Sequence, residues 1–177
     1  MKPTADFLLE VGCEEIPAGM IARACGELQV ILEKYLSTSG LIGKEKFEVF
    51  GAPRRMVAIC KALRTRQEDT EKEVTGPPKA VAYDAAGKPT RAAESFAAKQ
   101  GIALSYVYIV ATSRGEYLAA KIVHRGRSAE EILLETIPRA LQEIPWPRSM
   151  YWTHRAGARF IRPVRWLVAL FAGKVLK

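Results

Sequence analysis

The sequence predicts an α+β fold, built on a mainly antiparallel sheet with packed helices. Segments with a helical period and segments typical of strands are mixed along the 177 residues, and at least one strand pair is close enough in sequence to form a hairpin. Hydrophobic residues make up 49% of the chain and charged residues 26%, as in globular proteins that bury a core. We therefore expect one α+β domain over residues 1–177.

The first third of the chain is predicted to form a strand, a helix and a pair of strands. Residues 5–11 are a short apolar run typical of a buried strand. Pro17 suits the first turn of a helix. Apolar residues then recur in steps of three and four as far as about Ser37, which places them on one helical face. Residues 47–63 predict two strands around a break at residues 51–53.

The middle of the chain is predicted to be exposed and then helical. Residues 64–73 are highly charged, and we expect them to face solvent. Gly76, Pro77 and Pro78 predict an extended turn, because a residue before proline avoids the helical region. An Ala-rich helix follows, with Thr90 as its N-cap and Gly101 as its stop.

The next segment predicts a β-hairpin and the clearest helix of the chain. Residues 107–112 and 117–124 are rich in tyrosine and β-branched side chains, with a glycine-containing turn between them. Ser128 and Glu131 have the spacing of a capping box, which predicts a helix from there to Glu143.

The C-terminal end is predicted to be a basic loop followed by a strand. Residues 144–163 contain three prolines and favour a loop, and residues 163–173 form a last apolar strand. Residues 144–177 hold seven basic side chains and no Asp or Glu, which leaves +1 of the net charge of +8 for the first 143 residues. Such a stripe suits a polyanion such as nucleic acid, or a solvated face that aids solubility.

Several protein classes are excluded by the composition. The three cysteines are an odd count without the spacing of a metal site, so we expect small buried thiols and no metal centre. No segment matches a phosphate-binding loop, a dinucleotide fingerprint or a nucleophile elbow, so we expect no catalytic residue. The N-terminus lacks a signal peptide and residues 166–172 are too short an apolar run for a membrane span, which predicts a cytoplasmic protein.

Two pairs of charged residues precede or follow predicted turns. Glu14 and Glu15 stand near the start of the first helix, where the macrodipole favours carboxylates. Arg54 and Arg55 follow the rigid turn, which suits binding of a phosphate or a carboxylate. In the alternative interpretation, one of these arginines pairs with Glu14 or Glu15 and the other is solvated.

Aromatic residues are interleaved with the basic residues of the C-terminal end. Trp146 and Trp152 flank Arg148, and this pattern suits RNA because phosphates take the charge and unpaired bases stack on rings. Alternatively, the tryptophans are core or subunit-interface anchors, which is our expectation for Trp166. The candidate RNA-binding residues are Arg54, Arg55, Arg148, Arg155, Arg159, Arg162 and Arg165.

Blocks of sequence that cover nearly the whole chain resemble the beta subunit of the heterotetrameric bacterial glycyl-tRNA synthetase. In order, the blocks are FLLEVGCEEIP at 7–17, FGAPRRM at 50–56, GPP at 76–78, GKPT at 87–90, FA with QG at 96–97 and 100–101, and FIRPVRWL at 160–167. The family usually has Thr or Ser in place of Cys13, and Met-Arg-Trp-Gly in place of residues 150–153. The second departure removes an arginine and a glycine, so the resemblance gives less support for a specific RNA contact by the residues around 151.

The resemblance implies the N-terminal region of a larger subunit, truncated near the C-terminal end of this domain. It implies a glycine–tRNA ligase in which the alpha subunit uses ATP and Mg²⁺, so that the isolated fragment is inactive and holds no cofactor. The implied partners are the alpha subunit, in an alpha2-beta2 enzyme, and tRNA(Gly).

Three roles for this chain stay open at this point. The first is support of tRNA recognition, and the second is subunit assembly without RNA contact, with Trp146 and Trp152 as interface candidates. The third is an editing hydrolase that acts on mischarged tRNA through Glu14, Glu15 and His154.

Overall fold

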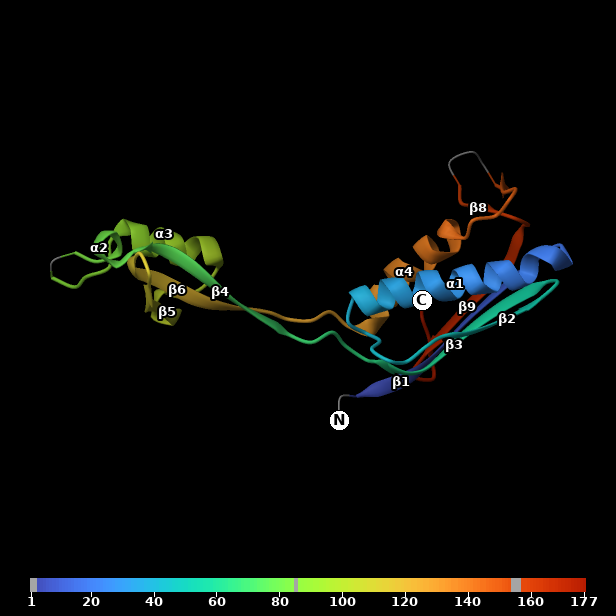
Figure 1. Cartoon of the computed structure of the whole chain (residues 1–177), viewed down its shortest axis with the longest axis horizontal. Helices are drawn as coiled ribbons and strands as arrows, with labels where there is room; N and C mark the ends of the chain where they lie inside the picture. Colours follow the sequence, from blue (N-terminus) through green and yellow to red (C-terminus); the bar gives the residue numbers. More distant parts are fainter. Residues whose placement is uncertain (1–2, 85, 154–156) are drawn as a thin grey trace. The chain divides into compact units, whose positions relative to one another are not determined.

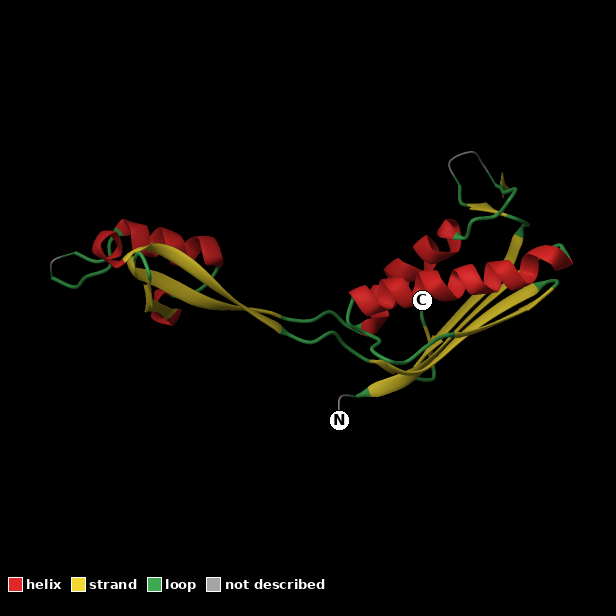
Figure 2. Cartoon of the chain, in the orientation of Figure 1, coloured by secondary structure: helices red, strands yellow, loops and turns green. Residues whose placement is uncertain are grey.

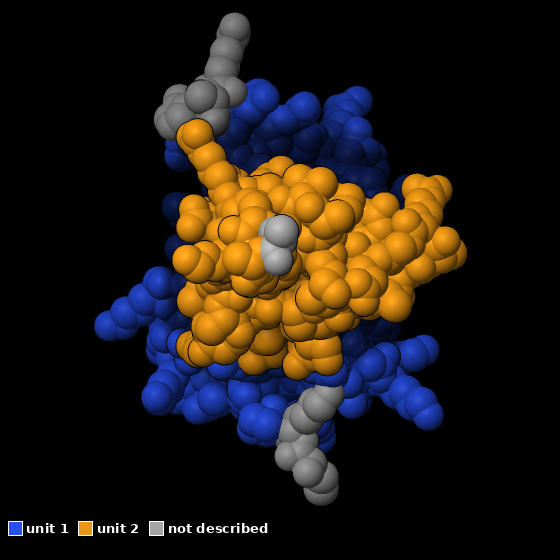
Figure 3. Space-filling view, turned by 90° about the vertical axis from the view of Figure 1, so that its left-hand side faces the viewer, with its two compact units in different colours: residues 1–68, 127–177 blue, residues 69–126 orange. Residues whose placement is uncertain are grey.

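The computed structural model describes residues 3–84, 86–153 and 157–177. The chain folds into two compact units, one made of residues 1–68 and 127–177 and the other of residues 69–126 (Figure 3). The sequence predicts one domain over residues 1–177. The difference arises because the inserted segment buries a small core of its own, around Ala93, Phe96 and Leu118.

A five-stranded antiparallel sheet forms the centre of the first unit (Figure 1). Its strand order is β10-β9-β1-β3-β2, so the N-terminal strand lies in the middle. The strands are β1 Thr4–Cys13, β2 Glu48–Ala52, β3 Arg55–Arg64, β9 Val164–Phe171 and β10 Lys174–Val175. The predictions of an N-terminal strand, a strand pair and a C-terminal apolar strand are confirmed.

Two helices, α1 Ala18–Thr38 and α4 Ala129–Glu143, cover one face of this sheet (Figure 2). The predicted apolar steps of α1 bury Cys25, Leu28 and Leu32 in the core that also contains side chains of β1. Gly51 allows the close approach of α1 to β2, because a Cβ atom there would lie 2.3 Å from Cγ2 of Ile21.

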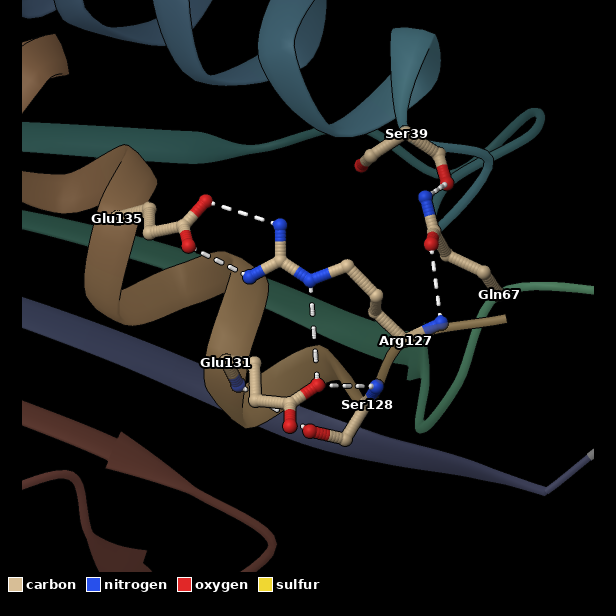
Figure 4. Close-up of polar contacts among 6 residues, drawn as sticks. All are labelled: Ser39, Gln67, Arg127, Ser128, Glu131 and Glu135. Atoms are coloured by element: carbon tan, nitrogen blue, oxygen red, sulfur yellow. Dashed lines mark hydrogen bonds and ion pairs between the residues drawn. The ribbon is translucent and has the colours of Figure 1, made fainter. Parts of the chain in front are cut away.

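Helix α4 is anchored where the chain leaves and rejoins the first unit (Figure 4). The predicted capping box is present, since Ser128 and Glu131 exchange side-chain and backbone hydrogen bonds. Arg127 pairs with Glu135 at 2.6 Å between Nη2 and Oε1. The side chain of Gln67 accepts from the backbone N–H of Arg127 and donates to the carbonyl of Ser39. These bonds tie both ends of the insertion to α1 and α4.

The second unit is a three-stranded antiparallel sheet, of order β4-β6-β5, with two helices. Its elements are β4 Thr70–Pro78, α2 Lys79–Ala82, α3 Arg91–Gln100, the 3-10 turn η1 Leu104–Tyr106, β5 Val107–Thr112 and β6 Gly115–His124. The predicted hairpin and helix are confirmed, with Thr90 as the N-cap of α3 and Gly101 in the left-handed conformation at its end. The turn expected at residues 76–78 is wrong, because β4 continues through them.

The described residues between 144 and 163 are mostly loop, as predicted, apart from two short paired strands. These are β7 Met150–Tyr151 and β8 Arg159–Phe160. Within the described ranges, no helix is long and apolar enough to cross a membrane.

Candidate nucleic-acid interface

Four of the predicted RNA-binding arginines come together at one end of the five-stranded sheet. We call Arg54, Arg55, Arg162 and Arg165 the arginine cluster. Antiparallel pairing explains their convergence, because β1 has β3 on one side and β9 on the other. In that register Gly12 lies beside Arg55 and Cys13 lies beside Val164, so the β2–β3 turn and the start of β9 meet where β1 ends.

The carboxylate of Glu14 lies between two of these guanidinium groups. Nε of Arg165 is 2.6 Å from Oε1 of Glu14, and Nη2 of Arg54 is 3.7 Å from Oε2. Nε of Arg162 donates to the backbone carbonyl of Glu15 at 2.9 Å. In the alternative interpretation, the pairing of one arginine with Glu14 is therefore confirmed, for Arg54, but the solvated second arginine is wrong, because Arg55 pairs with Glu10. The macrodipole interpretation is wrong, because α1 begins at Ala18 and has no acidic residue in its first turn.

Arg55 is also paired, which the sequence analysis did not foresee. Its Nη1 is 3.6 Å from Oε2 of Glu10, and Oε1 of the same carboxylate accepts from Nε1 of Trp166 at 2.7 Å. The side chains of Arg54, Arg55 and Arg165 nevertheless stay 58%, 56% and 61% exposed. The acidic residues thus orient guanidinium groups that still face solvent.

The cluster borders a hollow of about 560 Å³ between the end of β1 and the start of α1. Glu14, Pro17, Pro53, Arg54 and Arg162 contribute to its lining. Backbone hydrogen bonds fix these segments, because Cys13 donates to the carbonyl of Arg54 and Ile16 donates to that of Pro53. The hollow is therefore a rigid concave surface with cations and carboxylates on its rim.

The remaining candidates lie around the β7–β8 pair or outside the described residues. The Arg159 guanidinium lies 5.4 Å from the ring centroid of Tyr151, and its Nη2 donates to the carbonyl of Ser149 at 3.1 Å. Arg148 is exposed. Arg155 and the hydrolase candidate His154 lie outside the described residues.

The two tryptophans proposed as interface anchors differ in their surroundings. Trp146 is partly buried and makes an edge-to-face contact with Phe160, with ring centroids 5.2 Å apart. Its Nε1 is buried and has no hydrogen-bond partner among the described residues. Trp152 is 38% exposed, and its Nε1 donates to the carbonyl of Phe160. Trp152 therefore presents its indole ring to the surface, whereas Trp146 belongs mainly to the core.

The three cysteines are weak nucleophiles. Cys13, Cys25 and Cys60 are buried, and burial raises the pKa of each thiol, that of Cys60 to about 11. A thiol with a raised pKa carries little thiolate at neutral pH. Among the described residues, no group of three or more His, Cys, Asp or Glu side chains could hold a metal ion. The exposed guanidinium groups of the arginine cluster are suited to binding an anion.

A family model described as glycyl-tRNA synthetase beta subunit matches residues 7–177. The chain belongs to this family. It is 44% identical to the glycine–tRNA ligase beta subunit of Citrifermentans bemidjiense, over 97% of this chain and 25% of that protein. The corresponding subunit of Acidobacterium capsulatum is 40% identical over 97% of this chain and 24% of its own length. The chain thus spans about a quarter of the length of the curated relatives that it matches.

An exposed apolar surface of the central sheet was not predicted from the sequence. No described element of the first unit covers the face of the sheet opposite α1 and α4, and this face carries several large apolar side chains. We call it the open face, and its apolar residues are Leu8, Phe50, Val57, Ile59, Trp166, Val168 and Leu170. The signal was available, because residues 7–11 are apolar at positions that point to both faces of a strand.

Proposed function

We propose that this chain supports tRNA recognition in a glycine–tRNA ligase, as a non-catalytic part of its beta subunit. The observation that carries the proposal is the set of exposed guanidinium groups at one end of the sheet, oriented by Glu10 and Glu14. These groups adjoin a C-terminal stretch, residues 144–177, that contains no acidic side chain. Membership of the glycyl-tRNA synthetase beta subunit family favours tRNA as the RNA that binds this surface.

The physical reason is the cost of ordering long side chains on an anion. An arginine already held by a carboxylate loses little further freedom when it contacts a phosphate. Arginine has five N–H donors, and the Glu14 contact with Arg165 is made through Nε. The other donors of that guanidinium can reach a phosphate. Paired carboxylates also reduce the net charge of the cluster, so we expect a few defined contacts rather than strong unspecific attraction.

The chemistry of ligation is assigned by this proposal to the rest of the enzyme. ATP and Mg²⁺ would be used by an alpha subunit in an alpha2-beta2 assembly in the cytoplasm. The beta-subunit name of the relatives supports the existence of an alpha partner. The buried thiols and the ion-paired Glu14 offer no favourable acid, base or nucleophile here, which supports a non-catalytic role.

The test is the affinity of the chain for a tRNA(Gly) transcript at several salt concentrations. Arg162→Ala and Arg165→Ala are each expected to weaken binding and to reduce the salt slope by about one, as for the loss of one phosphate contact. Arg23→Ala, on the exposed side of α1, removes the same charge away from the cluster. An equal effect of all three variants, or no salt-dependent binding at all, would contradict the proposal.

A second function, subunit assembly, is favoured by the open face. Phe50 is 56% exposed and Trp166 is 40% exposed there, and large exposed apolar patches mark interaction surfaces. We propose the alpha subunit as the occupant, because permanent subunit interfaces are more apolar than other surfaces. In this proposal the open face, and not Trp146 and Trp152, forms the interface with the alpha subunit.

Co-purification with the alpha subunit tests this second function. Phe50→Lys and Val168→Lys are expected to reduce the association, whereas Val30→Lys, on the exposed side of α1, is expected to preserve it. The salt dependence of tRNA binding should stay unchanged in all three variants. Association that survives both open-face substitutions would exclude this face as the subunit interface.

A further inference from the structure

A pocket of about 500 Å³ lies between the second half of α4, the β7–β8 pair and the start of β9. Pro138 and Leu141 of α4 form one wall, and Trp152, Arg159, Arg165 and Leu167 contribute from the other side. Leu167 is the neighbour of Val11 in the sheet and is on the helix-covered face, yet it is 49% exposed. The start of β9 is therefore accessible within the first unit.

We propose that this pocket binds one unpaired nucleotide of an RNA. The inference rests on the proposed function in tRNA recognition and adds the part of the RNA that the pocket takes. The base would lie among Trp152 and the apolar walls, and its phosphate would lie at Arg159 and Arg165. Base stacking on an aromatic ring next to a cation is a usual mode of single-strand recognition.

The aromatic and cationic groups are already held in position. The hydrogen bond from Nε1 of Trp152 to the carbonyl of Phe160 measures 3.0 Å and orients the indole. Arg159 is held by Ser149 through Nη2, and Arg165 is held by Glu14 through Nε. Each guanidinium retains further donors for a phosphate. A preorganised site loses less side-chain entropy when it binds.

The charges of the pocket favour a nucleotide over an apolar side chain of a protein partner. Among the described residues that line it, two are arginines and none carries a carboxylate. Arg165 is already paired with Glu14, whereas no described carboxylate pairs with Arg159, which is held by the carbonyl of Ser149. An apolar side chain would exclude water from Arg159 without supplying a counter-charge, which is costly. A nucleotide brings a phosphate for Arg159 and for the remaining donors of Arg165, together with a flat base for the apolar walls. The volume is also within the usual range for small-ligand pockets.

A single-stranded RNA tetranucleotide is the direct probe, because it offers unpaired bases without a folded tRNA. Trp152→Ala is expected to weaken its binding to this chain about tenfold or more, as for loss of one base–aromatic stack. Leu167→Glu places a carboxylate in the pocket at a half-exposed position and is expected to weaken binding at least as much. Leu134→Glu, on α4 at a position 44% exposed, is the matched control and should bind the probe normally.

Intact tRNA(Gly) separates this inference from the function on which it rests. Salt-dependent tRNA binding with tetranucleotide affinity unchanged by Trp152→Ala and Leu167→Glu would overturn the pocket and leave tRNA recognition standing. Absence of tRNA binding at low salt would overturn both. Loss of alpha-subunit association in Leu167→Glu, with unchanged tetranucleotide binding, would show that the pocket takes a protein side chain instead.

Discussion

The two faces of the central sheet use the same strands and differ in what lies on them. Phe7, Leu9 and Val11 of β1 point to the helix-covered face and are at most 1% exposed. Leu8 and Glu10 alternate with them and lie on the open face, where they are partly accessible. The cross-strand neighbours of Glu10 are Val57 and Val168. One face thus packs into the core, and the other is an apolar surface with one charged network, Glu10 with Arg55, towards the end of β1.

The comparison shows that the apolar composition of a strand does not by itself determine which of its faces is buried. A strand that is apolar at consecutive positions is usually buried on both faces. In β1 the helices account for the burial of one set of side chains, and no described element of the first unit covers the other set. The composition of the open face therefore agrees with a second packing partner, as the assembly proposal requires.

The largest expected difference between the faces is in the cost of removing an apolar side chain. Leu9 is fully buried on the covered face, so Leu9→Ala should lower the free energy of unfolding by roughly 2–5 kcal/mol. Val168→Ala on the open face should cost about 1 kcal/mol or less. Urea unfolding of both variants measures the two costs. Similar losses would mean that the open face is packed in solution.

Two glycines permit a sharper version of the same comparison. A Cβ at Gly51 would be 2.3 Å from Ile21, on the packed α1, whereas a Cβ at Gly12 would be 1.8 Å from the ring of Trp166 on the open face. Gly51→Ala should cost roughly 1–3 kcal/mol, because α1 cannot move without disturbing the core. Gly12→Ala should cost about 1 kcal/mol, since the indole can rotate into solvent with loss of its hydrogen bond to Glu10.

The readout for Gly12→Ala is tryptophan fluorescence together with urea unfolding. Movement of Trp166 into water should shift its emission to longer wavelength, and the variant Trp166→Phe identifies its share of the signal. A larger loss of stability in Gly12→Ala than in Gly51→Ala would contradict the expectation that Trp166 can move aside more easily than Ile21.

Local signals let the sequence predict the helices and their ends. The capping box at Ser128 and the Thr90–Gly101 frame of α3 depend on residues a few positions apart. Strand β4 was missed because its exposed charges and its Gly-Pro-Pro end resemble a loop. The residues of β6 that pair with it lie 39 to 54 positions later, from Pro78 with Tyr117 to Thr70 with His124. The separate second unit was missed for the same reason, since it exists only once β4 is paired.

The candidate site was predicted by residue type but not by arrangement. Arginines at positions 54 and 165 were recognised as anion-binding candidates, yet their shared contact with Glu14 depends on how β3 and β9 flank β1. Strand order follows from long-range pairing that a single sequence does not specify. The contact of Arg55 with Glu10 was missed because Glu10 was assigned to a buried strand.

The helical cover of the sheet can be weakened through its cap. Ser128→Ala removes the acceptor for the Glu131 N–H at the start of α4, and about 1 kcal/mol of stability should be lost. Hydrogen exchange should become faster in the first turn of α4. Glu131→Gln keeps a side-chain acceptor for the Ser128 N–H and should cost less. An equal loss in both variants would mean that the charge of Glu131, and not the capping geometry, stabilises the helix start.

The smallest expected effect concerns the Cys60 thiol on the covered face, because its titration changes the stability only at alkaline pH. Burial raises the pKa of the Cys60 thiol from 9.0 to about 11, and the thiol is fully buried beside Phe7 in the sheet. A pKa that is higher in the folded than in the unfolded state gives a contribution to stability that is complete below pH 9 and is lost as the pH rises towards 11. The free energy of unfolding should therefore fall over that range, and that of the variant Cys60→Ala should fall less steeply.

Thiol alkylation at pH 8 is a second measurement. The variant Cys60→Ala and the unchanged chain should be alkylated equally, since the native Cys60 is protonated and inaccessible at that pH. Rapid alkylation of Cys60 at pH 8 in the folded chain would show that the covered face opens locally, and the contrast between the two faces would then be one of dynamics as well as of packing.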